Sequence, residues 1–270
     1  MLLHFYKMNG AGNDFVVIDN RALDLPLTRE QIALLCDRHR GVGADGLLAV
    51  EPAEQGADFK FRYYNADGGE AEMCGNGARC FGRFTARLLG GNPERITFET
   101  IAGTLAAEFV DDQVCIAMSD PVDLHLDAPV TIDRFEPAIH TLNTGVPHAV
   151  AFVDDLDGLD VIKHGAATRY HTHFEPAGTN VNFVKVLADD HIAIRTYERG
   201  VEGETLACGT GMTACALIHH LLNGATSPVK VDVKGGETLE IGFIPGPAQT
   251  FTGVTLTGPA DFVFDGQIEV

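Results

Sequence analysis

Two short motifs carry the residues with the clearest chemical potential. Cys74-Gly75-Asn76-Gly77 and Cys208-Gly209-Thr210-Gly211 each place a cysteine before a glycine-rich turn, and each turn precedes a run of helical character, residues 78–89 and 212–222. Backbone N–H groups at a helix start lack intrahelical partners and lie at the positive end of the helix dipole. Such a turn can bind a carboxylate and lowers the pKa of an adjacent thiol. Each half of the chain is therefore predicted to present an activated sulfur beside an anion site.

A matched pair of such sites predicts proton transfer at a carbon atom. Inversion of the α-carbon of an amino acid needs one group that removes a proton and another that returns one from the opposite face. A thiol whose pKa lies near neutrality can do either, because acid–base catalysis works best when the pKa is close to the operating pH. Backbone N–H groups after Cys74 and Cys208 would stabilise the enediolate charge. This chemistry needs no cofactor, and the sequence contains no evident lysine site for PLP.

The elements that would position the cysteines repeat in order. Thr28-Arg29-Glu30-Gln31 matches a capping box and predicts a helix to about residue 39. A strand that ends in Tyr64 or Tyr197 precedes each cysteine motif by ten or eleven residues. Alternation and turn residues predict strands at 2–8, 15–18, 47–50, 59–65, 96–100, 104–110 and 114–118, and again at 139–142, 149–153, 182–187, 192–197, 229–233, 238–243, 249–257 and 262–264. This repeated order indicates an internal duplication.

The fold class that follows is α+β, with two similar barrel-like β domains that each wrap around one central helix and are related by a pseudo-twofold axis. Ser119-Asp120-Pro121 is the expected junction. We therefore expect an N-terminal half at 1–118, which carries Cys74, and a C-terminal half at 119–270, which carries Cys208. The last strand could return to the first domain.

Composition narrows the classes of partner. The 270-residue chain has a net charge of −19, which argues against nucleic acid or an anionic membrane surface. No uncharged apolar run approaches the ~18 residues of a membrane span. Residues 1–7 lack the apolar region and cleavage site of a signal peptide. We therefore expect a cytoplasmic protein that binds a small molecule and neither nucleic acid nor membrane.

The other cysteines and a group of histidines are expected to have structural roles. Cys36, Cys80, Cys115 and Cys215 lie in apolar surroundings, which is typical of small buried side chains. The spacing C-x-x-C of a zinc or thioredoxin motif does not occur. His164, His171 and His173 have no carboxylate or cysteine at ligand spacing and are expected in a solvated loop. We therefore expect no metal site.

Several motifs in order make the chain resemble the diaminopimelate epimerase family along most of its length. Besides the two cysteine motifs, the resemblance is carried by Lys7-Met8-Asn9-Gly10-Ala11-Gly12-Asn13-Asp14-Phe15, Gly43-Ala44-Asp45-Gly46, Tyr64-Asn65-Ala66-Asp67-Gly68, Asn143-Thr144-Gly145-Val146-Pro147-His148, Gly178-Thr179-Asn180-Val181-Asn182 and Tyr197-Glu198-Arg199-Gly200. The resemblance implies a PLP-independent isomerase that interconverts LL- and meso-2,6-diaminopimelate for lysine and peptidoglycan synthesis. It also implies the two-domain fold and a homodimer.

The resemblance also implies roles for individual residues. Cys74 and Cys208 correspond to the catalytic acid–base pair. The residues that correspond to the substrate-binding set are Asn13, Asn65, Gly75, Asn76, Asn180, Glu198, Arg199, Gly209 and Thr210. His148 and Glu198 resemble the pair that tunes the thiol pKa values. Val146 and Gly46 stand where some members carry asparagine and glutamine, so two substrate contacts of the family are in question here.

Two other functions are compatible with the same motifs. One is a different PLP-independent amino-acid racemase of the same fold, which would act for instance on proline or histidine. The other is a non-catalytic amino-acid-binding protein or a thiol redox sensor. Amides and an arginine at the far end of the site favour a long substrate with a second amino-acid head, because these groups can bind its carboxylate.

Overall fold

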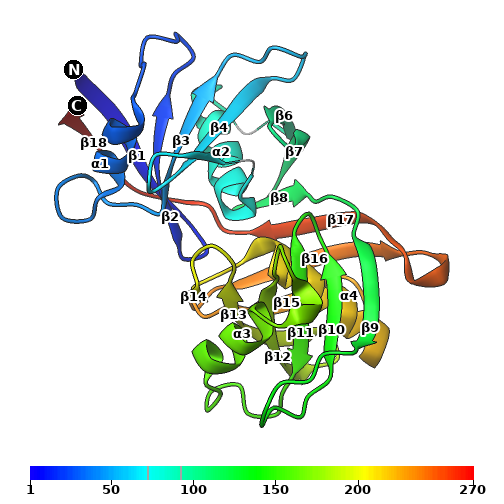
Figure 1. Cartoon of the computed structure of the whole chain (residues 1–270). Helices are drawn as coiled ribbons and strands as arrows, with labels where there is room; N and C mark the ends of the chain where they lie inside the picture. The colour runs from blue at the N-terminus through cyan, green and yellow to red at the C-terminus, as the bar shows by residue number, and fades with distance from the viewer. Residues whose placement is uncertain (72, 92) are drawn as a thin grey trace. The chain divides into compact units, whose positions relative to one another are not determined.

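The computed structural model describes residues 1–71, 73–91 and 93–270 and divides the chain into two compact units (Figure 1). The first unit comprises Met1–Ala117 together with Gly258–Val270, and the second comprises Met118–Thr257. The final segment, whose place the sequence left open, thus lies with the first unit. Its strand pairs antiparallel with the first strand of the chain, and the N-terminal amino group donates to the carbonyl of Val270 at 2.7 Å.

The first unit consists mainly of strands. Its elements are β1 (Leu2–Gly10), β2 (Asn13–Asp19), α1 (Arg29–Cys36), β3 (Gly46–Glu51), β4 (Phe59–Asn65), β5 (Glu70–Ala71), α2 (Gly75–Leu88), β6 (Arg95–Thr100), β7 (Gly103–Val110), β8 (Gln113–Ala117) and β18 (Asp261–Glu269). The second unit contains β9 (Val122–Ala128), β10 (Ile139–Asn143), β11 (Pro147–Phe152), α3 (Val161–Arg169), η1 (Thr172–Phe174), β12 (Asn180–Ala188), β13 (His191–Glu198), β14 (Gly203–Thr205), α4 (Gly209–Asn223), β15 (Val229–Asp232), β16 (Thr238–Pro245), η2 (Pro247–Gln249) and β17 (Phe251–Gly258).

The strand pairings repeat from one unit to the other. In the first unit β1–β2 is antiparallel, β2–β3 parallel, β3–β4 and β4–β5 antiparallel, β4–β6 parallel, and β6–β7 and β7–β8 antiparallel. In the second unit the same sequence of pairings runs through β10, β11, β12, β13, β14, β15, β16 and β17. This correspondence agrees with the predicted internal duplication and with the predicted α+β class.

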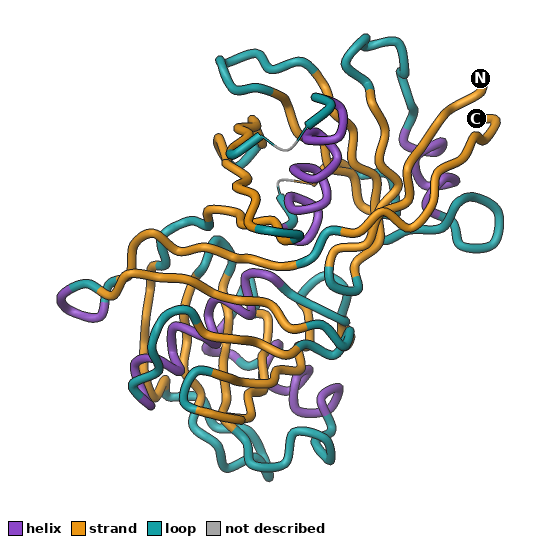
Figure 2. Tube along the Cα trace, turned by 180° about the vertical axis from the view of Figure 1, so that it is seen from behind, coloured by secondary structure: helices purple, strands orange, loops and turns teal. Residues whose placement is uncertain are grey.

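Each unit wraps its strands around a long helix (Figure 2). α2 contacts β1 to β4 and β6 to β8, and its fully buried Phe81 meets Phe61 and Phe98 at ring-centroid distances of 5.0 Å. α4 contacts β10 to β13, β15 and β16, and the side chains of Cys215, Leu217 and Ile218 are inaccessible to solvent. Burial of such apolar area contributes roughly 25 cal/mol per Å². The helices that carry the cysteine motifs are thus the central packing elements of their units.

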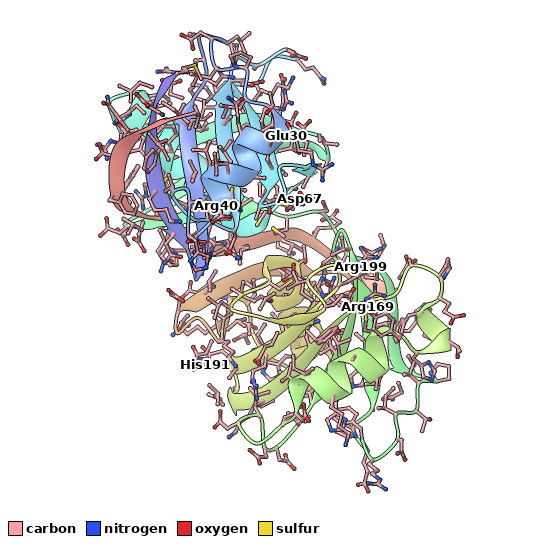
Figure 3. All side chains as sticks on the ribbon, turned by 60° about the vertical axis from the view of Figure 1, so that its left-hand side comes forward. Glu30, Arg40, Asp67, Arg169, His191 and Arg199 are labelled. Carbon is pink, nitrogen blue, oxygen red and sulfur yellow. The ribbon has the colours of Figure 1, made fainter. Side chains whose placement is uncertain are left out.

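α1 confirms the predicted capping box but ends earlier than expected. The Thr28 side chain accepts from the Gln31 backbone, and the Gln31 side chain accepts from the Thr28 backbone. The expected end near residue 39 was wrong, because Asp37 takes an extended conformation (ψ 121°) and terminates the helix at Cys36. Glu30 lies on the exposed side of α1 (Figure 3).

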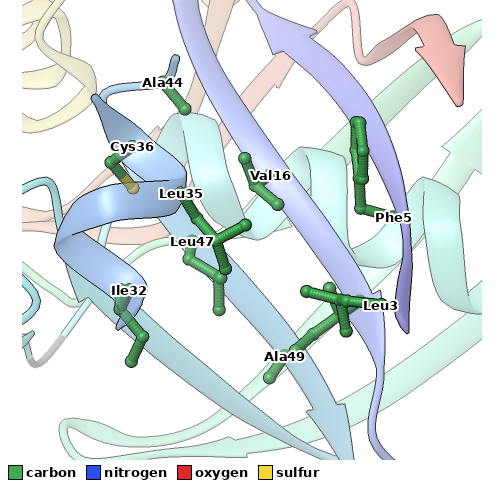
Figure 4. Packing of buried hydrophobic residues seen from close by; sticks show 10 residues of the cluster. Leu3, Phe5, Val16, Ile32, Leu35, Cys36, Ala44, Leu47 and Ala49 are labelled. Carbon is green, nitrogen blue, oxygen red and sulfur yellow. The ribbon is translucent and has the colours of Figure 1, made fainter. Parts of the chain in front are cut away.

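The inner face of α1 packs on the outer side of the sheet of the first unit (Figure 4). Its Ile32, Leu35 and Cys36 belong to one buried cluster with residues of β1, β2 and β3. α1 therefore covers a second face of the sheet. The helix was predicted, but its position on this face was not, because only one central helix was expected in each domain.

α3 was not predicted. His164 was expected in a solvated loop, but it lies in α3 and stacks against Phe135 at a centroid distance of 4.9 Å. The buried face of α3 is formed by Val161, Gly165 and Thr168, so its periodicity rests on small residues rather than on large apolar ones. A Cβ atom at Gly165 would lie 2.4 Å from the Cβ atom of Tyr197, and glycine therefore permits this close helix–strand packing.

Among the residues that the structure describes, every helix is too short or too polar to cross a lipid bilayer.

Candidate active site

Cys74 lies at the N-cap of α2, where its backbone is extended (φ −139°) and the helix begins at Gly75. The helix starts three residues earlier than the sequence indicated, so the glycine-rich turn is itself the first helical turn. Gly75 and Asn76 are buried, whereas Cys74 is partly exposed. The Cys74 carbonyl accepts from the N–H of Ala78 at 2.7 Å. The sulfur-bearing residue therefore stands where the N–H groups of the first turn begin, as the motif predicted.

A line of amide and carboxylate groups orients the side chain of Asn76. Asn76 Nδ2 donates to Asn13 Oδ1 at 2.5 Å, and Asn13 Nδ2 donates to Asp45 Oδ2 at 3.0 Å. Asp45 is held in turn by Arg38, whose Nη2 lies 2.8 Å from Asp45 Oδ1. The structure thus joins two predicted substrate-binding residues, Asn13 and Asn76, directly beside the first cysteine motif.

The side chain of Arg79 is fully buried one turn into α2. Its Nη2 donates to Asn76 Oδ1 at 2.9 Å, its Nε to the Pro259 carbonyl at 3.2 Å, and its Nη1 to the Gly75 carbonyl at 3.4 Å. A buried guanidinium needs such acceptors, because the loss of hydration is otherwise uncompensated. Arg79 therefore fixes the amide of Asn76 from the side opposite to Asn13.

Ion pairs around Asp14, which share Arg38 with Asp45, support the start of β2, where Asn13 lies. Lys7 Nζ lies 2.7 Å from Asp14 Oδ2 and also donates to the carbonyl of Gly43, and Arg38 forms a bidentate pair with Asp14. Burial would raise the pKa of the Asp14 carboxyl, but hydrogen bonds from Arg38 and Lys7 outweigh it and lower this pKa to about 2. The carboxylate therefore remains charged at neutral pH.

Cys208 occupies the corresponding place in the second unit. It lies at the N-cap of α4 with an extended backbone (φ −131°), the helix begins at Gly209, and the side chain is 8% exposed. Cys208 Sγ lies 3.6 Å from Thr210 Oγ1. Thr144 Oγ1 donates to the Thr210 carbonyl at 2.9 Å and so contacts the same first turn from the loop before β11.

His148 reaches this turn from β11. Its Nε2 lies 2.9 Å from Thr210 Oγ1, and its side chain is almost completely buried. Burial lowers the pKa of the imidazole to about 3, with a smaller contribution from the positive charge of Arg199. His148 is therefore neutral at neutral pH. The structure brings together the predicted residues His148, Thr210 and Cys208.

Asn182 lies behind His148 on β12. Asn182 Nδ2 is 3.1 Å from His148 Nδ1 and 3.1 Å from the Ala149 carbonyl, while Asn182 Oδ1 accepts from Thr196 Oγ1 at 2.9 Å. Asn182 and Thr196 are buried. A Cβ atom at Gly211 would lie 2.4 Å from Asn182 Oδ1 and 3.3 Å from Cys208 Sγ. The second glycine of the motif therefore leaves the space that Asn182 occupies beside the cysteine.

Asn180 and the loop after β13 form a second group in this unit. Asn180 Oδ1 accepts from the Arg199 N–H at 2.8 Å, and Asn180 Nδ2 donates to the Pro147 carbonyl at 3.2 Å. Glu198 ends β13 and is partly exposed, as is Arg199, whose Nη1 donates to the Ala177 carbonyl at 3.3 Å (Figure 3). Three predicted substrate-binding residues thus lie close together, with Glu198 and Arg199 partly exposed and Asn180 buried beneath the Arg199 backbone.

Three further positions named in the sequence analysis, Asn65, Gly46 and Val146, lie at or next to the ends of strands. Asn65 ends β4 and is exposed, and it pairs in register with Gly46 of β3. A Cβ atom at Gly46 would lie 2.5 Å from the Tyr64 carbonyl oxygen, so this backbone leaves no room for the glutamine of some family members. Val146 precedes β11 and is partly exposed.

The other thiols have a different environment. Cys36, Cys80 and Cys215 are buried as expected, whereas Cys115, expected to be buried, is partly exposed on β8. Burial raises the pKa of Cys36 and of Cys80 to about 12, and it raises that of Cys215 well above its usual value. These three remain thiols near neutrality and serve as packing groups.

Within the residues that the structure describes, groups of three or more His, Cys, Asp or Glu side chains with the geometry of a metal site do not occur.

Sequence reasoning missed the residues that support the two turns. Asn182, Thr196 and Arg79 were not assigned a role, although the sequence carried a signal for Asn182 and for Arg79. Asn182 lies two residues after Asn180 on a strand and shares its face. Arg79 is a charged residue directly before Cys80, which was expected to be buried in the same helix. A polar residue at a position where a buried side chain is predicted indicates a buried hydrogen-bond network.

Comparison with known proteins gives a consistent result. The sequence profile of the family described as diaminopimelate epimerase matches residues 5–124 and 140–262. The diaminopimelate epimerase of Aquifex aeolicus (strain VF5) is 43% identical over 279 residues, and the alignment covers 98% of each chain. That of Chlorobaculum tepidum is 44% identical over 268 residues and covers 97% of this chain and 99% of the relative.

Solved structures with little sequence identity share the fold. A phenazine biosynthesis protein of the PhzF family from Bacillus anthracis superimposes with a TM-score of 0.77 at 15% identity and covers 100% of both chains. A hydroxyproline epimerase from Agrobacterium vitis gives a TM-score of 0.72 at 17% identity and covers 99% of this chain and 92% of that chain. These similarities establish the fold of this chain and not its substrate.

Proposed function

The chain belongs to the diaminopimelate epimerase family, and we propose that it interconverts LL- and meso-2,6-diaminopimelate with Cys74 and Cys208 as the two proton carriers. The observation that carries the proposal is the repetition of one arrangement. In each unit a cysteine is the N-cap of the central helix, and a Gly-x-Gly turn forms the first helical turn.

The reaction requires one thiolate and one thiol. The thiolate removes the α-proton, and the electron pair of the C–H bond moves into the carboxylate to give an enediolate. The opposite thiol then donates its proton to the other face of the α-carbon, so the charge on sulfur passes from one cysteine to the other. The N–H groups of Gly75, Asn76, Gly209 and Thr210 are suited to the enediolate charge, since helix N-termini favour anions. The exchanged proton comes from the enzyme, and no cofactor takes part in a step.

The remaining predicted residues are suited to the far end of the substrate. Asn13, Asn65 and Asn180 carry amides, which can donate to a carboxylate and accept from an ammonium group. The guanidinium of Arg199 can form a bidentate pair with a carboxylate. Glu198 offers a carboxylate to an ammonium group, and with His148 it is assigned to tuning the thiol pKa values. Together these groups suit a substrate with two amino-acid heads.

We assign the protein to lysine and peptidoglycan precursor synthesis in the cytoplasm and expect a homodimer. Membership of the diaminopimelate epimerase family supports this assignment. Sedimentation equilibrium would test the dimer. A mass of one chain across the concentration range in which the enzyme is active would contradict it.

The substrate is tested by an epimerisation assay on purified, reduced protein without added cofactor. LL-diaminopimelate should convert to the meso isomer, while proline and histidine should not be racemised. Conversion of proline or histidine alone would retain the chemistry and change the substrate. Binding without conversion would favour the amino-acid-binding alternative. Loss of activity on addition of a chelator would also contradict the cofactor-independent mechanism.

A further inference from the structure

Donors and acceptors can be assigned in only one consistent way along the hydrogen bonds that connect Asn182 to Cys208. The assignment begins at Asn182. The Ala149 carbonyl can only accept, so the group of Asn182 that faces it at 3.1 Å is the NH₂ group. The hydroxyl of Thr196 supplies the matching donor to Asn182 Oδ1. The opposite orientation of the amide would place two oxygen acceptors against each other in a buried site, which is unfavourable.

This orientation determines which nitrogen of His148 carries the proton. The NH₂ group of Asn182 also faces His148 Nδ1 at 3.1 Å, so Nδ1 must accept. The proton of the neutral imidazole then resides on Nε2. Because the ring is buried and lies near the positive charge of Arg199, the doubly protonated form is unfavourable as well.

The direction continues to the sulfur. Nε2–H donates to Thr210 Oγ1 at 2.9 Å. The hydroxyl of Thr210 can then donate its hydrogen to Cys208 Sγ, which lies 3.6 Å from Thr210 Oγ1. A hydrogen bond donated to sulfur stabilises the thiolate relative to the thiol. The chain of donors runs from Thr196 and Asn182 through His148 and Thr210 to Cys208.

We propose that Asn182 is a positioning residue that holds His148 in its Nε2–H form, and that Thr210 thereby donates its hydroxyl hydrogen to Cys208 and favours the thiolate in the resting enzyme. Asn182 acts through His148 and does not touch the substrate. The importance of this inference for catalysis rests on the proposed function, but the hydrogen-bond chain itself is a property of the substrate-free protein.

The tautomer can be measured directly by ¹⁵N NMR, in which protonated and unprotonated ring nitrogens have different chemical shifts. The chain has 11 histidines, so the His148 signals are assigned as those lost in His148→Gln. We expect an unprotonated Nδ1 and a protonated Nε2 in the wild-type protein. In Asn182→Ala, the Nδ1–H form should become populated. A proton on Nδ1 in the wild type, or an unchanged spectrum in folded Asn182→Ala, would overturn the proposal.

The effect on sulfur is measured by alkylation with iodoacetamide in a Cys74→Ala background, with the Cys208 peptide followed by mass spectrometry. Loss of the hydroxyl in Thr210→Val should slow alkylation about tenfold, which corresponds to a change of about one pKa unit. Thr210→Ser keeps the hydroxyl and should stay within about twofold of the parent. Equal rates for Thr210→Val and Thr210→Ser would contradict the proposal. If Asn182→Ala does not fold, Thr196→Val with Thr196→Ser as its control tests the same orientation.

These two experiments use no substrate. If they succeed while diaminopimelate is not converted, the proposed function fails and the hydrogen-bond chain stands. If diaminopimelate is converted but His148 has its proton on Nδ1, the proposed function stands and the hydrogen-bond chain fails.

Discussion

At the scale of single residues, the two cysteines have similar backbone positions but different support. The turn after Cys74 is held by hydrogen bonds among the buried guanidinium of Arg79 and the amides of Asn76 and Asn13. The turn after Cys208 is backed by the neutral imidazole of His148. The duplication therefore preserved the N-cap position of the sulfur, while the groups behind it diverged. We expect the two thiols to differ in reactivity for this reason.

Replacement of Arg79 tests the support of the first turn. Arg79→Met removes the donors to Asn76 Oδ1, to the Gly75 carbonyl and to the Pro259 carbonyl, so buried acceptors lose their partners. We expect the free energy of unfolding to fall by about 3 kcal/mol, measured by urea denaturation. Arg83→Met, on the same helix at a partly exposed position, should cost less than about 1 kcal/mol. Similar losses in the two variants would show that the buried contacts of Arg79 carry no special weight.

The protonation of His148 links stability to pH. Its pKa in the folded protein, about 3, lies below the value of 6.5 expected in the unfolded chain. The unfolded state therefore binds more protons below pH 6.5, and stability present above that pH is lost as the pH falls toward 3. Between about pH 7 and pH 5, the wild type should lose about 2 kcal/mol more than His148→Gln does. Denaturation curves of both proteins at the two pH values measure this difference, and equal losses would contradict a neutral, buried His148.

At the scale of elements, the first turns of α2 and α4 form a matched pair for mutation. A methyl group at Gly211 would collide with Asn182 Oδ1 at 2.4 Å, whereas at Gly77 the nearest atom would be Leu48 Cδ2 at 3.3 Å. Gly211→Ala should therefore destabilise the protein by about 2 kcal/mol and slow alkylation of Cys208. Gly77→Ala should cost less, because its methyl group would meet the far end of a leucine side chain at 3.3 Å, and alanine's advantage over glycine in a helix, about 1 kcal/mol, offsets that contact. Thermal denaturation compares them, and a greater loss for Gly77→Ala would contradict this account.

The sequence predicted the elements whose patterns are strong. Strand β4 was predicted with its observed bounds, and the capping box of α1 was identified from Thr28 and Gln31. α3 was missed because its buried face consists of small residues such as Gly165, which carry no hydrophobic period. The first helical turns of α2 and α4 were predicted to be glycine-rich turns that precede the helices, because glycine disfavours a helix in isolation. Tertiary packing overrides that preference here.

The same limit applies to the candidate site. The cysteine motifs predicted that each sulfur lies at the start of a long helix, and residue type and local order were sufficient for that placement. The partners of His148 depended on which strands lie side by side, because β11 and β12 are parallel neighbours in the sheet. The residue pattern of a strand does not show which other strand it pairs with. The contact between Asn182 and His148 could therefore not be predicted.

At the scale of the whole molecule, the first unit is built from the two ends of the chain. β18 pairs with β1 along its length, and Phe264 meets Phe5 at a centroid distance of 6.0 Å. Deletion of residues 261–270 should therefore destabilise the first unit by exposing the edge and core face of β1. Hydrogen exchange should rise in peptides of β1 and β2 and stay low in those of β12 and β13. Equal loss of protection in both units would contradict this division of the fold.

The proposed mechanism requires the thiols of Cys74 and Cys208 to act on opposite faces of one carbon atom. Its most direct test is the position of deuterium when LL-diaminopimelate is converted in D₂O and stopped at low conversion. We expect deuterium at the α-carbon of the meso product and little in the remaining LL substrate, because the returning hydron comes from a different sulfur than the one that removed the proton. Cys74→Ala and Cys208→Ala should each abolish conversion. Deuterium at equal rates in substrate and product, or full activity in either variant, would contradict the two-thiol mechanism.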